Sequence, residues 1–456
     1  MPSPSPFAPE ALECRVPRYT SYPSAAHFRT ALGAEGHRRW LAEVAPAEAL
    51  SLYVHVPFCA GICAFCAFRT QSARHYAPVL RYVGALEREI GLVGAALGGA
   101  GRKITRVHWG GGSPTVLDPP EIARVHRALV RSFPGAEAAE FSIEVDPRDL
   151  TAARLAAFTA AGLTRATLSV QDMDATVQAA IGRWQGRRKI GAAMAALRKA
   201  GVDALSLDLL YGLPQQTSET LARTIEAVLE HNPERLAVYG YAHVPWMAKR
   251  QRTIVPEALP DTKARRAQAA LVRAQLLEAG YHGIGIDHFA RPGDPLVEAA
   301  AKGRLKRGFL GYSDDPAAIT IGFGASAIST LPQGYVQNQE ATALWRLSVE
   351  AGRLPVARAA ALGLDDRIRR DAISEILCSF SLDLERLHAR YGDFAKPLHA
   401  GVGRLLATAP AGALIPWRGG FRIAPEWPER TERTRLIAAT FDRYLSAYPA
   451  RYALAI

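Results

Sequence analysis

Cysteine and acidic residues are scarce in this 456-residue sequence, and both shortages narrow the classes of protein to which it can belong. There are five cysteines, and three of them lie within eight positions, at 59, 63 and 66. An odd number distributed in this way excludes the disulfide framework of a small secreted protein and favours a reducing, cytoplasmic compartment. Asp and Glu number 43 against 55 Lys and Arg, which leaves a net charge of +12 and favours an acidic partner. No long Lys or Arg run occurs, so we expect no nucleic-acid partner.

Long hydrophobic runs are also missing. The longest uncharged stretch, 316–339, contains Gly322, Pro332 and Asn338 and is too polar to span a membrane. The opening residues Met-Pro-Ser-Pro-Ser-Pro lack the basic and apolar parts of a signal peptide, so we expect none. Hydrophobic residues make up 49% and charged residues 21%, a balance that is typical of a chain with a large folded core. We expect a globular protein without a membrane span, present as a monomer.

Short apolar segments rich in β-branched residues alternate with longer helical patterns from residue 51 onward. Six of them are predicted to be strands: 51–56, 106–109, 140–145, 166–170, 204–210 and 236–241. One intervening helix is predicted at Val79–Ile90 from its single apolar stripe, and another is predicted after Asp118 as N-cap. Strand–helix units in series predict an α/β fold, which we expect to be a partial (β/α)6 barrel with a mainly helical C-terminal domain.

The same pattern divides the chain into four parts. We expect an N-terminal extension without regular structure at 1–45, the barrel at 46–300, a closing segment at 301–354 and a helical domain at 355–456. Polar residues recur at the ends of the predicted strands, where barrel enzymes build their sites. We therefore predict that one cavity collects Glu144, Gln171, Arg183 and Asp208.

The densest chemistry lies in the segment Cys59-Ala-Gly-Ile-Cys63-Ala-Phe-Cys66. Three thiolates on one loop can converge on a single centre, and thiolates suit iron–sulfur clusters and zinc. Structural zinc needs four ligands, and Cys14 and Cys378 each stand alone in the sequence. The spacing favours an iron–sulfur cluster with one open iron, while zinc and metal-free buried cysteines stay open as alternatives.

A run of three glycines follows the second predicted strand, at Gly110–Gly112, and is followed by Ser113. Glycines let the backbone approach a ligand closely, and we expect their free N–H groups to bind a carboxylate or an amine-bearing group. The segment lacks the lysine of a phosphate-binding loop.

Together the cysteine loop and the glycine run resemble the radical S-adenosylmethionine (SAM) superfamily. A narrower resemblance, to the oxygen-independent coproporphyrinogen III oxidase (dehydrogenase) family, covers nearly the whole chain. It is carried by the segments 17–23, 142–148, 169–172, 208–214, 241–245, 287–292 and 368–371. This resemblance implies decarboxylation of two propionates of coproporphyrinogen III to give protoporphyrinogen IX, in haem biosynthesis.

The resemblance also implies the cofactors and their sites. Cys59, Cys63 and Cys66 would hold a [4Fe-4S] cluster, and two SAM molecules would bind beside it. Tyr53, Gly111, Glu144 and Ile328 would line the first SAM, Phe65 would lie between the two, and Gly112, Ser113, Gln171, Arg183, Asp208 and Ala242 would line the second. The expected partners are the anionic tetrapyrrole and an unidentified electron donor, with Arg15, Arg18 and Arg291 as candidates to hold the carboxylates.

Four positions depart from the family pattern. Phe68 replaces a fourth cysteine, and Gly182, Gly240 and Leu310 replace side-chain amides. Phenylalanine cannot supply a thiol, but we expect it to fill space and shield the cluster. Two alternatives therefore stay open: a diverged paralog that binds haem, like the haem chaperone-like relatives, and another radical SAM reaction such as methyl transfer.

Overall fold

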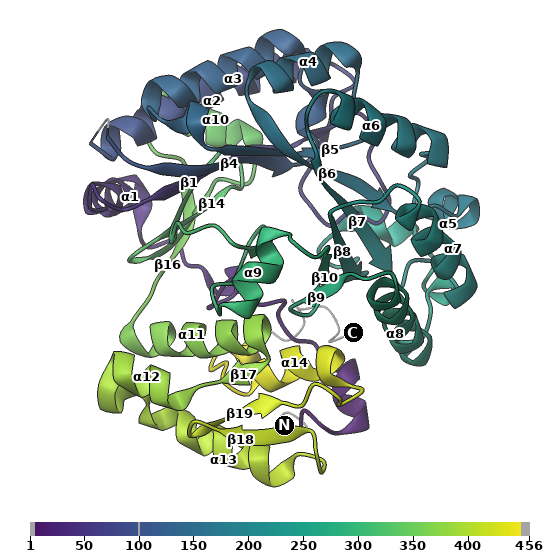
Figure 1. Cartoon of the computed structure of the whole chain (residues 1–456). Helices are drawn as coiled ribbons and strands as arrows, with labels where there is room; N and C mark the ends of the chain where they lie inside the picture. Colours follow the sequence, from purple (N-terminus) through teal and green to yellow (C-terminus); the bar gives the residue numbers. More distant parts are fainter. Residues whose placement is uncertain (1–4, 99–100, 448–456) are drawn as a thin grey trace.

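An arc of parallel strands with helices on its outer side forms the larger part of the protein (Figure 1). The structure is a computed structural model and describes residues 5–98 and 101–447. Six parallel strands succeed one another in the arc: β1 (Leu50–Val56), β4 (Ile104–Gly111), β5 (Glu140–Val145), β6 (Leu163–Gln171), β7 (Ala204–Tyr211) and β8 (Arg235–Gly240). Each strand is followed by helix, which confirms the predicted partial barrel of six strand–helix units.

The helices of these units cover the convex side of the arc (Figure 1). They are α2 (Ala77–Ala96), α3 (Pro119–Ser132), α4 (Ala152–Ala160), α5 (Ala175–Ala180), α6 (Arg187–Lys199), α7 (Ser218–Leu229) and α8 (Thr262–Glu278). On β7, Leu205, Leu207 and Leu209 are fully buried in the core beneath the helices. Since side chains alternate along a strand, Ser206 and Asp208 face the inside of the arc. The alternation is what leaves polar groups inside the barrel.

Further strands extend both ends of the arc. Beside β1 lie β13 (Ile319–Phe323), β14 (Ile328–Leu331), β15 (Gly334–Asn338) and β16 (Val356–Ala361), and beside β8 lie β10 (His288–Ala290) and β9 (His282–Ile284). Between them the chain forms α9 (Pro295–Ala301), α10 (Thr342–Glu350) and the hairpin of β11 (Lys306–Gly308) and β12 (Gly311–Ser313). Because β16 pairs with β15, the boundary expected at residue 355 falls inside the sheet.

A smaller, mainly helical unit lies below the arc (Figure 1). It contains α11 (Leu364–Ser379), β17 (Ser381–Leu382), α12 (Leu384–Tyr391), α13 (His399–Thr408), β18 (Leu414–Trp417), β19 (Gly420–Ile423) and α14 (Arg430–Ala439). Its core also takes in residues from the N-terminal part, among them Leu12, Val16 and Tyr22. We propose that this unit begins at α11 and includes the N-terminal segment as part of its core.

The expectation that residues 1–45 lack regular structure was wrong for their described part. A short 3-10 helix spans Pro9–Glu13 and α1 spans Gly33–Ala42. The pattern of Pro and Ser near the start suggested a loose segment, but Leu12 and Tyr22 are 1% and 2% exposed. Burial against a partner far away in the sequence is not visible in local composition, which is why the expectation failed.

Asp118 occupies the predicted N-cap position of α3 but does not make the predicted capping hydrogen bond. Asp118 precedes the helix with extended backbone, yet its side chain makes no capping hydrogen bond. Its carboxylate instead pairs with Arg154, 2.9 Å away. The side chain therefore links α3 to α4.

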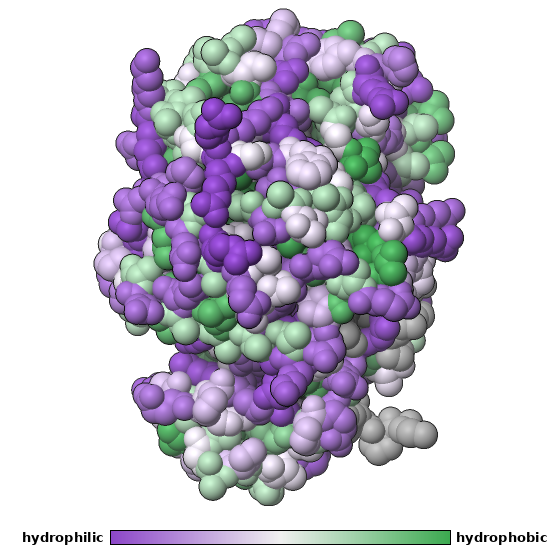
Figure 2. Space-filling view, turned by 90° about the vertical axis from the view of Figure 1, so that its right-hand side faces the viewer, coloured by the Kyte–Doolittle hydropathy of each residue, from purple (hydrophilic) through white to green (hydrophobic). Residues whose placement is uncertain are grey.

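No helix within the described ranges combines the length and hydrophobicity needed to cross a membrane. On the face drawn in Figure 2, hydrophobic residues form small patches scattered among hydrophilic ones. Phe68, on the cysteine loop, is among the exposed large hydrophobic residues of the molecule.

Candidate functional site

The three clustered cysteines lie on the loop that leaves β1 at the mouth of the barrel. Cys59 ends the short strand β2 (Phe58–Cys59), which pairs with β3 (Gln71–Ser72) and so ties the two ends of the loop together. Burial raises the pKa of the Cys59 thiol to about 12, and the neighbouring Cys66 and Cys63 add to the rise. The sulfurs therefore lie close enough to oppose one another's ionisation.

The thiols are near one another without forming a finished metal site. In the part of the chain that the structure describes, no three Cys, His, Asp or Glu side chains have the geometry to hold a metal ion. Protonated thiols gain nothing by converging, because the energy that draws ligands together comes from the metal itself. The assignment of Cys59, Cys63 and Cys66 as cluster ligands stays a prediction, which their shared loop and their surroundings support.

Two arginines point at the middle cysteine. Arg183 donates a hydrogen bond of 3.4 Å to the sulfur of Cys63, and Arg148 donates one of 3.7 Å to the same atom. Both guanidinium groups also pair with Asp146, at 3.2 and 2.7 Å. A cluster held by three thiolates brings negative charge to the loop, and these cations are placed to balance it. The donor set and its charged surroundings therefore fit a [4Fe-4S] cluster.

Position 68 acts on the loop through its backbone. Burial raises the pKa of the Cys66 thiol, while the backbone N–H of Phe68 and the charge of Arg250 act in the opposite direction. Phe68 is 69% exposed and so fills little space within the protein, and its shielding of a bound cluster stays a prediction. Sequence alone gave no sign of this, because a lone aromatic residue among glycines and cysteines usually packs inward.

The glycine run is explained by close packing. Gly111 donates its N–H to the Glu144 carboxylate at 2.9 Å, and Gly112 donates to the carbonyl of Val56 at 2.8 Å. The expectation that these N–H groups are free for a ligand was therefore wrong. A Cβ on Gly112 would lie 2.5 Å from the carbonyl oxygen of Phe58, so only glycine lets the cysteine loop fold back over β4.

Ser113 continues this packing. It is 2% exposed, donates its N–H to the carbonyl of Phe58 at 2.7 Å, and shares a hydrogen bond of 2.7 Å with the Thr115 hydroxyl. Thr115 in turn accepts from the N–H of Asp146 at 3.2 Å. In this structure Ser113 thus joins the cysteine loop to the end of β5.

Glu144 lies on β5 at the centre of a polar cluster that the sequence only partly indicated. Burial favours the neutral acid, but His108 and the Gly111 N–H outweigh it and keep the pKa of Glu144 below its ordinary value. The His108 ring lies 3.6 Å from the carboxylate and stacks on Tyr53, with 5.9 Å between ring centroids. Tyr53 also bonds His55 at 2.8 Å. An ionised carboxylate here suits an amine or ribose hydroxyl of a ligand.

Of three further predicted residues, Gln171 ends β6, Asp208 lies within β7 and Arg183 follows α5 (Ala175–Ala180). Gln171 ends β6 with a φ of 70°, which is uncommon for a residue with a side chain and is held here by a bulge in the pairing with β7. Burial raises the pKa of Asp208 to about 7, with Glu144 adding to the rise and Arg183 opposing it. Glu144, Arg183 and Asp208 therefore lie close together. That they and Gln171 share one ligand cavity stays a prediction.

The segment before Arg183 explains one departure from the family pattern. Gly182 has a φ of 64°, a left-handed conformation that Gly and Asn both adopt readily. Just before it, the Ile181 carbonyl accepts a hydrogen bond of 2.9 Å from the Ala64 N–H of the cysteine loop. Glycine at 182 thus preserves the backbone that holds this loop.

Phe65 and Ala242 are brought together by a residue that we did not predict. Gln251 donates to the carbonyl of Phe65 at 2.6 Å and to that of Ala242 at 3.1 Å. Ile328 lies on the opposite flank: it begins β14, and its carbonyl would be 2.7 Å from a Cβ on Gly322, the residue beside Tyr53. The predicted residues therefore divide between two flanks of the barrel mouth.

Several residues at this mouth were missed by sequence reasoning. They are His108, Arg148, Arg250 and Gln251. Only His108 and Arg148 carried a signal, since both lie within segments that were already singled out. The other two come from the stretch after β8, where local pattern gives no sign of proximity to the cysteines.

The three arginines that were expected to hold substrate carboxylates lie in different parts of the structure. Arg291 donates its backbone N–H to Glu234, just before β8, and so lies at the end of the barrel away from the cysteine loop. Its assignment was wrong, because the antiparallel β10 carries the following residue back to the far end. The Arg15 guanidinium lies over the exposed ring of Trp246. Arg18 donates to the carbonyl of Gly240, the last residue of β8, at 2.5 Å.

Comparison with known proteins agrees with this geometry. Residues 53–228 match the Radical SAM superfamily. An oxygen-independent coproporphyrinogen III oxidase from Cereibacter sphaeroides is 43% identical over 443 residues, which cover 97% of each chain. That of Escherichia coli is 40% identical over 399 residues, covering 88% of this chain and 87% of the other. A solved structure of coproporphyrinogen III oxidase from Escherichia coli, a radical SAM enzyme, has a TM-score of 0.88 at 36% identity and covers 94% of this chain and 98% of its own. The chain belongs to the oxygen-independent coproporphyrinogen III oxidase family of radical SAM enzymes.

Proposed function

We propose that the protein decarboxylates two propionates of coproporphyrinogen III to vinyl groups and so produces protoporphyrinogen IX in haem biosynthesis. The observation that carries this proposal is the position of Cys59, Cys63 and Cys66 beside Arg183 at the mouth of a barrel whose relatives match over nearly the whole chain. The reaction needs a strong hydrogen abstractor and a site for a highly anionic substrate. Both needs agree with the residues at this mouth.

Radical SAM enzymes use a [4Fe-4S] cluster and SAM, which together supply a carbon-centred radical that removes a hydrogen atom from the substrate. In this chain Cys59, Cys63 and Cys66 would hold the cluster. Arg148 and Arg183 would balance the charge of the thiolates, and they are held in position by Asp146. Cluster binding would require each thiol to lose its proton, against the raised pKa that burial imposes on Cys59.

The two flanks of the mouth support two SAM positions. Tyr53, Glu144 and Ile328 come from the β1, β5 and β14 side, while the other flank is formed by β6, β7 and the segment after β8. On the first flank the ionised Glu144 would bind an amine or hydroxyl of SAM. On the second, Arg183 would pair with a carboxylate and Asp208 would accept from a ribose hydroxyl. Phe65 lies next to the segment that carries Ala242, beside this second flank.

The alternative of a haem-binding paralog depended on Phe68, and the structure weakens that argument. The Phe68 side chain is 69% exposed, and its contribution to Cys66 comes from the backbone N–H. Any residue other than proline supplies the same N–H. The backbone contact at position 68 therefore does not depend on a cysteine side chain, which favours oxidase chemistry. We infer a reducing, cytoplasmic compartment because the reaction needs three reduced thiols.

Anaerobic assay of the reconstituted protein with a reductant, SAM and coproporphyrinogen III tests this function. We expect protoporphyrinogen IX and 5′-deoxyadenosine by mass spectrometry, and neither product from Cys63→Ala. Cleavage of SAM with coproporphyrinogen III left intact would contradict the assigned substrate. Retention of added haem by the same preparation would then favour the haem-binding alternative.

A further inference from the structure

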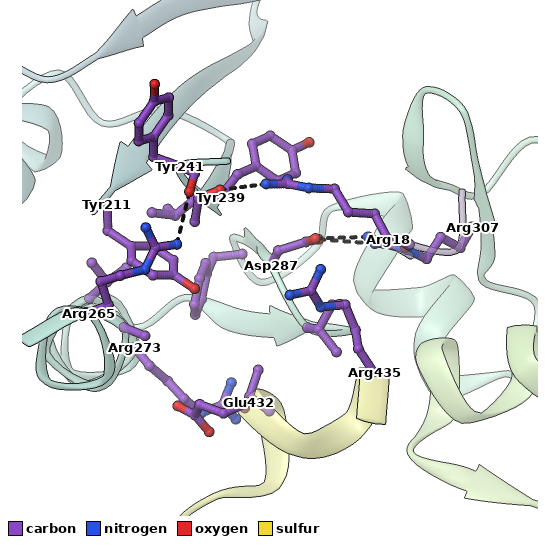
Figure 3. A pocket seen from close by; sticks show the side chains of 17 residues that line it. Arg18, Tyr211, Tyr239, Tyr241, Arg265, Arg273, Asp287, Arg307, Glu432 and Arg435 are labelled. Carbon is purple, nitrogen blue, oxygen red and sulfur yellow. Dashed lines mark hydrogen bonds and ion pairs between the residues drawn. The ribbon is translucent and has the colours of Figure 1, made fainter. Parts of the chain in front are cut away.

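A cavity rich in arginine lies between the end of β8 and the C-terminal unit, away from the cysteine loop (Figure 3). It has a volume of about 80 Å³. Its walls come from β8, α8, the segment before β10, β11, α14 and the N-terminal segment. Five arginines line it: Arg18, Arg265, Arg273, Arg307 and Arg435. They come from four separate parts of the chain, so the fold gathers them.

Among the described residues that line this cavity, arginines outnumber carboxylates by five to two. The carboxylates are Asp287, which is bound by both terminal nitrogens of Arg307 at 3.2 and 3.0 Å, and Glu432 on α14. Burial lowers the pKa of Arg435 to about 10, and the positive charges of Arg18 and Arg307 lower it further. Like charges held together in a buried place favour the binding of an anion.

The cavity also has apolar walls, as a site for a large organic acid requires. Tyr211 and Tyr239 lie on it, and the Arg265 guanidinium faces the Tyr211 ring with 6.0 Å to its centroid. Figure 3 shows Arg435 rising from α14 toward Asp287, while Arg18 extends above Asp287 toward the end of β8. Arginine is the side chain best suited to carboxylates, because its planar guanidinium can bind both oxygens at once.

Gly240, a departure from the family pattern, keeps the cavity open. A Cβ at this position would lie 3.0 Å from the Tyr211 ring and 3.3 Å from the Arg265 guanidinium. Its carbonyl accepts the hydrogen bond of 2.5 Å that holds Arg18. The lack of a side chain at 240 thus leaves room between the tyrosine and the arginines.

The cavity and the cysteine loop are joined by a short stretch of chain. Tyr239 and Gly240 end β8, and two residues later the carbonyl of Ala242 binds Gln251, which also binds Phe65 on the cysteine loop. Burial raises the pKa of the Tyr239 hydroxyl, and the nearby Asp208 adds to the rise. The cavity and the segment that contacts the cysteine loop therefore both adjoin the same end of β8.

We propose that this arginine-lined cavity binds propionate carboxylates of the tetrapyrrole on the part of the macrocycle that faces away from the cysteine loop. The inference rests on the proposed function and identifies the residues that recognise its substrate. The substrate carries four propionates, and the product retains two.

Binding of coproporphyrin III tests the proposal without turnover, since this oxidised macrocycle carries the same four propionates. Measured by fluorescence titration on the reconstituted protein, Arg435→Met is expected to weaken binding roughly tenfold to a hundredfold, the loss that one charged hydrogen-bonding partner causes. Arg435→Lys should recover part of the loss. Arg18→Met, on another segment, repeats the test if Arg435→Met does not fold.

Arg430→Met is the matched control, because Arg430 lies on the same helix and places its guanidinium over the Phe380 ring, outside the cavity. It should bind coproporphyrin III like the unchanged protein. In turnover, Arg435→Met should raise KM for coproporphyrinogen III with little change in kcat or in iron content. Unchanged binding in both Arg435→Met and Arg18→Met, or an equal loss in Arg430→Met, overturns the proposal. If the unchanged protein binds coproporphyrin III and these arginine variants do not, but coproporphyrinogen III is never converted, the cavity assignment stands and the proposed function fails.

Discussion

Arg183 bridges Asp146 and Cys63, with 3.2 Å to the carboxylate and 3.4 Å to the sulfur. The guanidinium is 5% exposed, and its Nε has no hydrogen-bond partner among the described residues. A buried donor without a partner is costly, so this nitrogen is placed to bind a ligand. The arrangement links the cysteine loop to the second flank through one cation.

Replacing Arg183 should separate SAM binding from cluster binding. We expect Arg183→Met to keep its iron, because the three cysteines are unchanged, and to bind SAM roughly tenfold to a hundredfold more weakly. Equilibrium dialysis with labelled SAM and iron analysis on the same samples measure both. Arg188→Met, on the exposed face of α6, should behave like the unchanged protein. Equal SAM affinity in both variants would contradict a role for Arg183.

The cluster assignment predicts a sharp division among the five cysteines. Anaerobic reconstitution should give about four irons per chain. Ala in place of Cys59, Cys63 or Cys66 should remove most of this iron and the visible absorption of the cluster. Cys378→Ala, in the C-terminal unit, should leave both intact. A full cluster in Cys63→Ala would refute the assignment.

Position 68 should tolerate changes of its side chain but should not tolerate removal of its backbone N–H. Phe68→Ala and Phe68→Cys are expected to retain activity within about twofold, since the ring is 69% exposed. Phe68→Pro removes the N–H that acts on Cys66 and should lower cluster occupancy. Iron content and the rate of SAM cleavage distinguish the three variants. A strong gain of decarboxylation in Phe68→Cys would mean that the missing thiol limits this enzyme.

Asp208 should make the protein less stable as the pH rises. Burial holds the pKa of its carboxyl at about 7, above the ordinary value of 3.8. Between these values the folded protein keeps a proton that the unfolded chain has lost, so the contribution of Asp208 to stability falls as pH rises toward 7. Asp208→Asn has no such proton and should gain stability relative to the unchanged protein between pH 5 and pH 8.

Thermal unfolding at several pH values measures this difference. Asp203→Asn, on the exposed segment before β7, is the control and should follow the unchanged protein at every pH. The Asn variant at 208 should bind SAM more weakly if Asp208 accepts from a ribose hydroxyl. Curves for Asp208→Asn that run parallel to the unchanged protein from pH 5 to pH 8 would contradict the raised pKa.

The sequence predicted the barrel well because its signals are local. The strand 140–145 agrees with β5 at both ends, and the stripe from Val79 to Ile90 lies within α2. Asp208 was expected in the barrel from its position near a strand end, and in the structure the buried leucines of β7 take the other face of the strand. The positions of these strands and helices follow from the periodicity of apolar residues along the sequence.

What could not be predicted depends on contacts between distant segments. The N–H groups of Gly111 and Gly112 are bonded within the protein because the cysteine loop folds back over β4, which no glycine pattern reveals. Arg291 lies at the end of the barrel away from the cysteine loop, because β10 runs antiparallel to β8. Gln251 reaches Phe65 across 186 positions of sequence. Such contacts arise from packing, and one sequence carries no record of them.

The shared core of the two chain ends has a consequence for the order in which the protein is made. Leu12, Val16 and Tyr22 are synthesised long before their packing partners on α11 and α14. Until then these apolar side chains stay exposed, and the Arg435 wall of the cavity does not exist. The strands β1 to β8 and the cysteine loop are complete long before that moment. The nascent chain therefore passes through an interval in which the cysteine loop has been made and the barrel mouth is still uncovered on the side of the C-terminal unit.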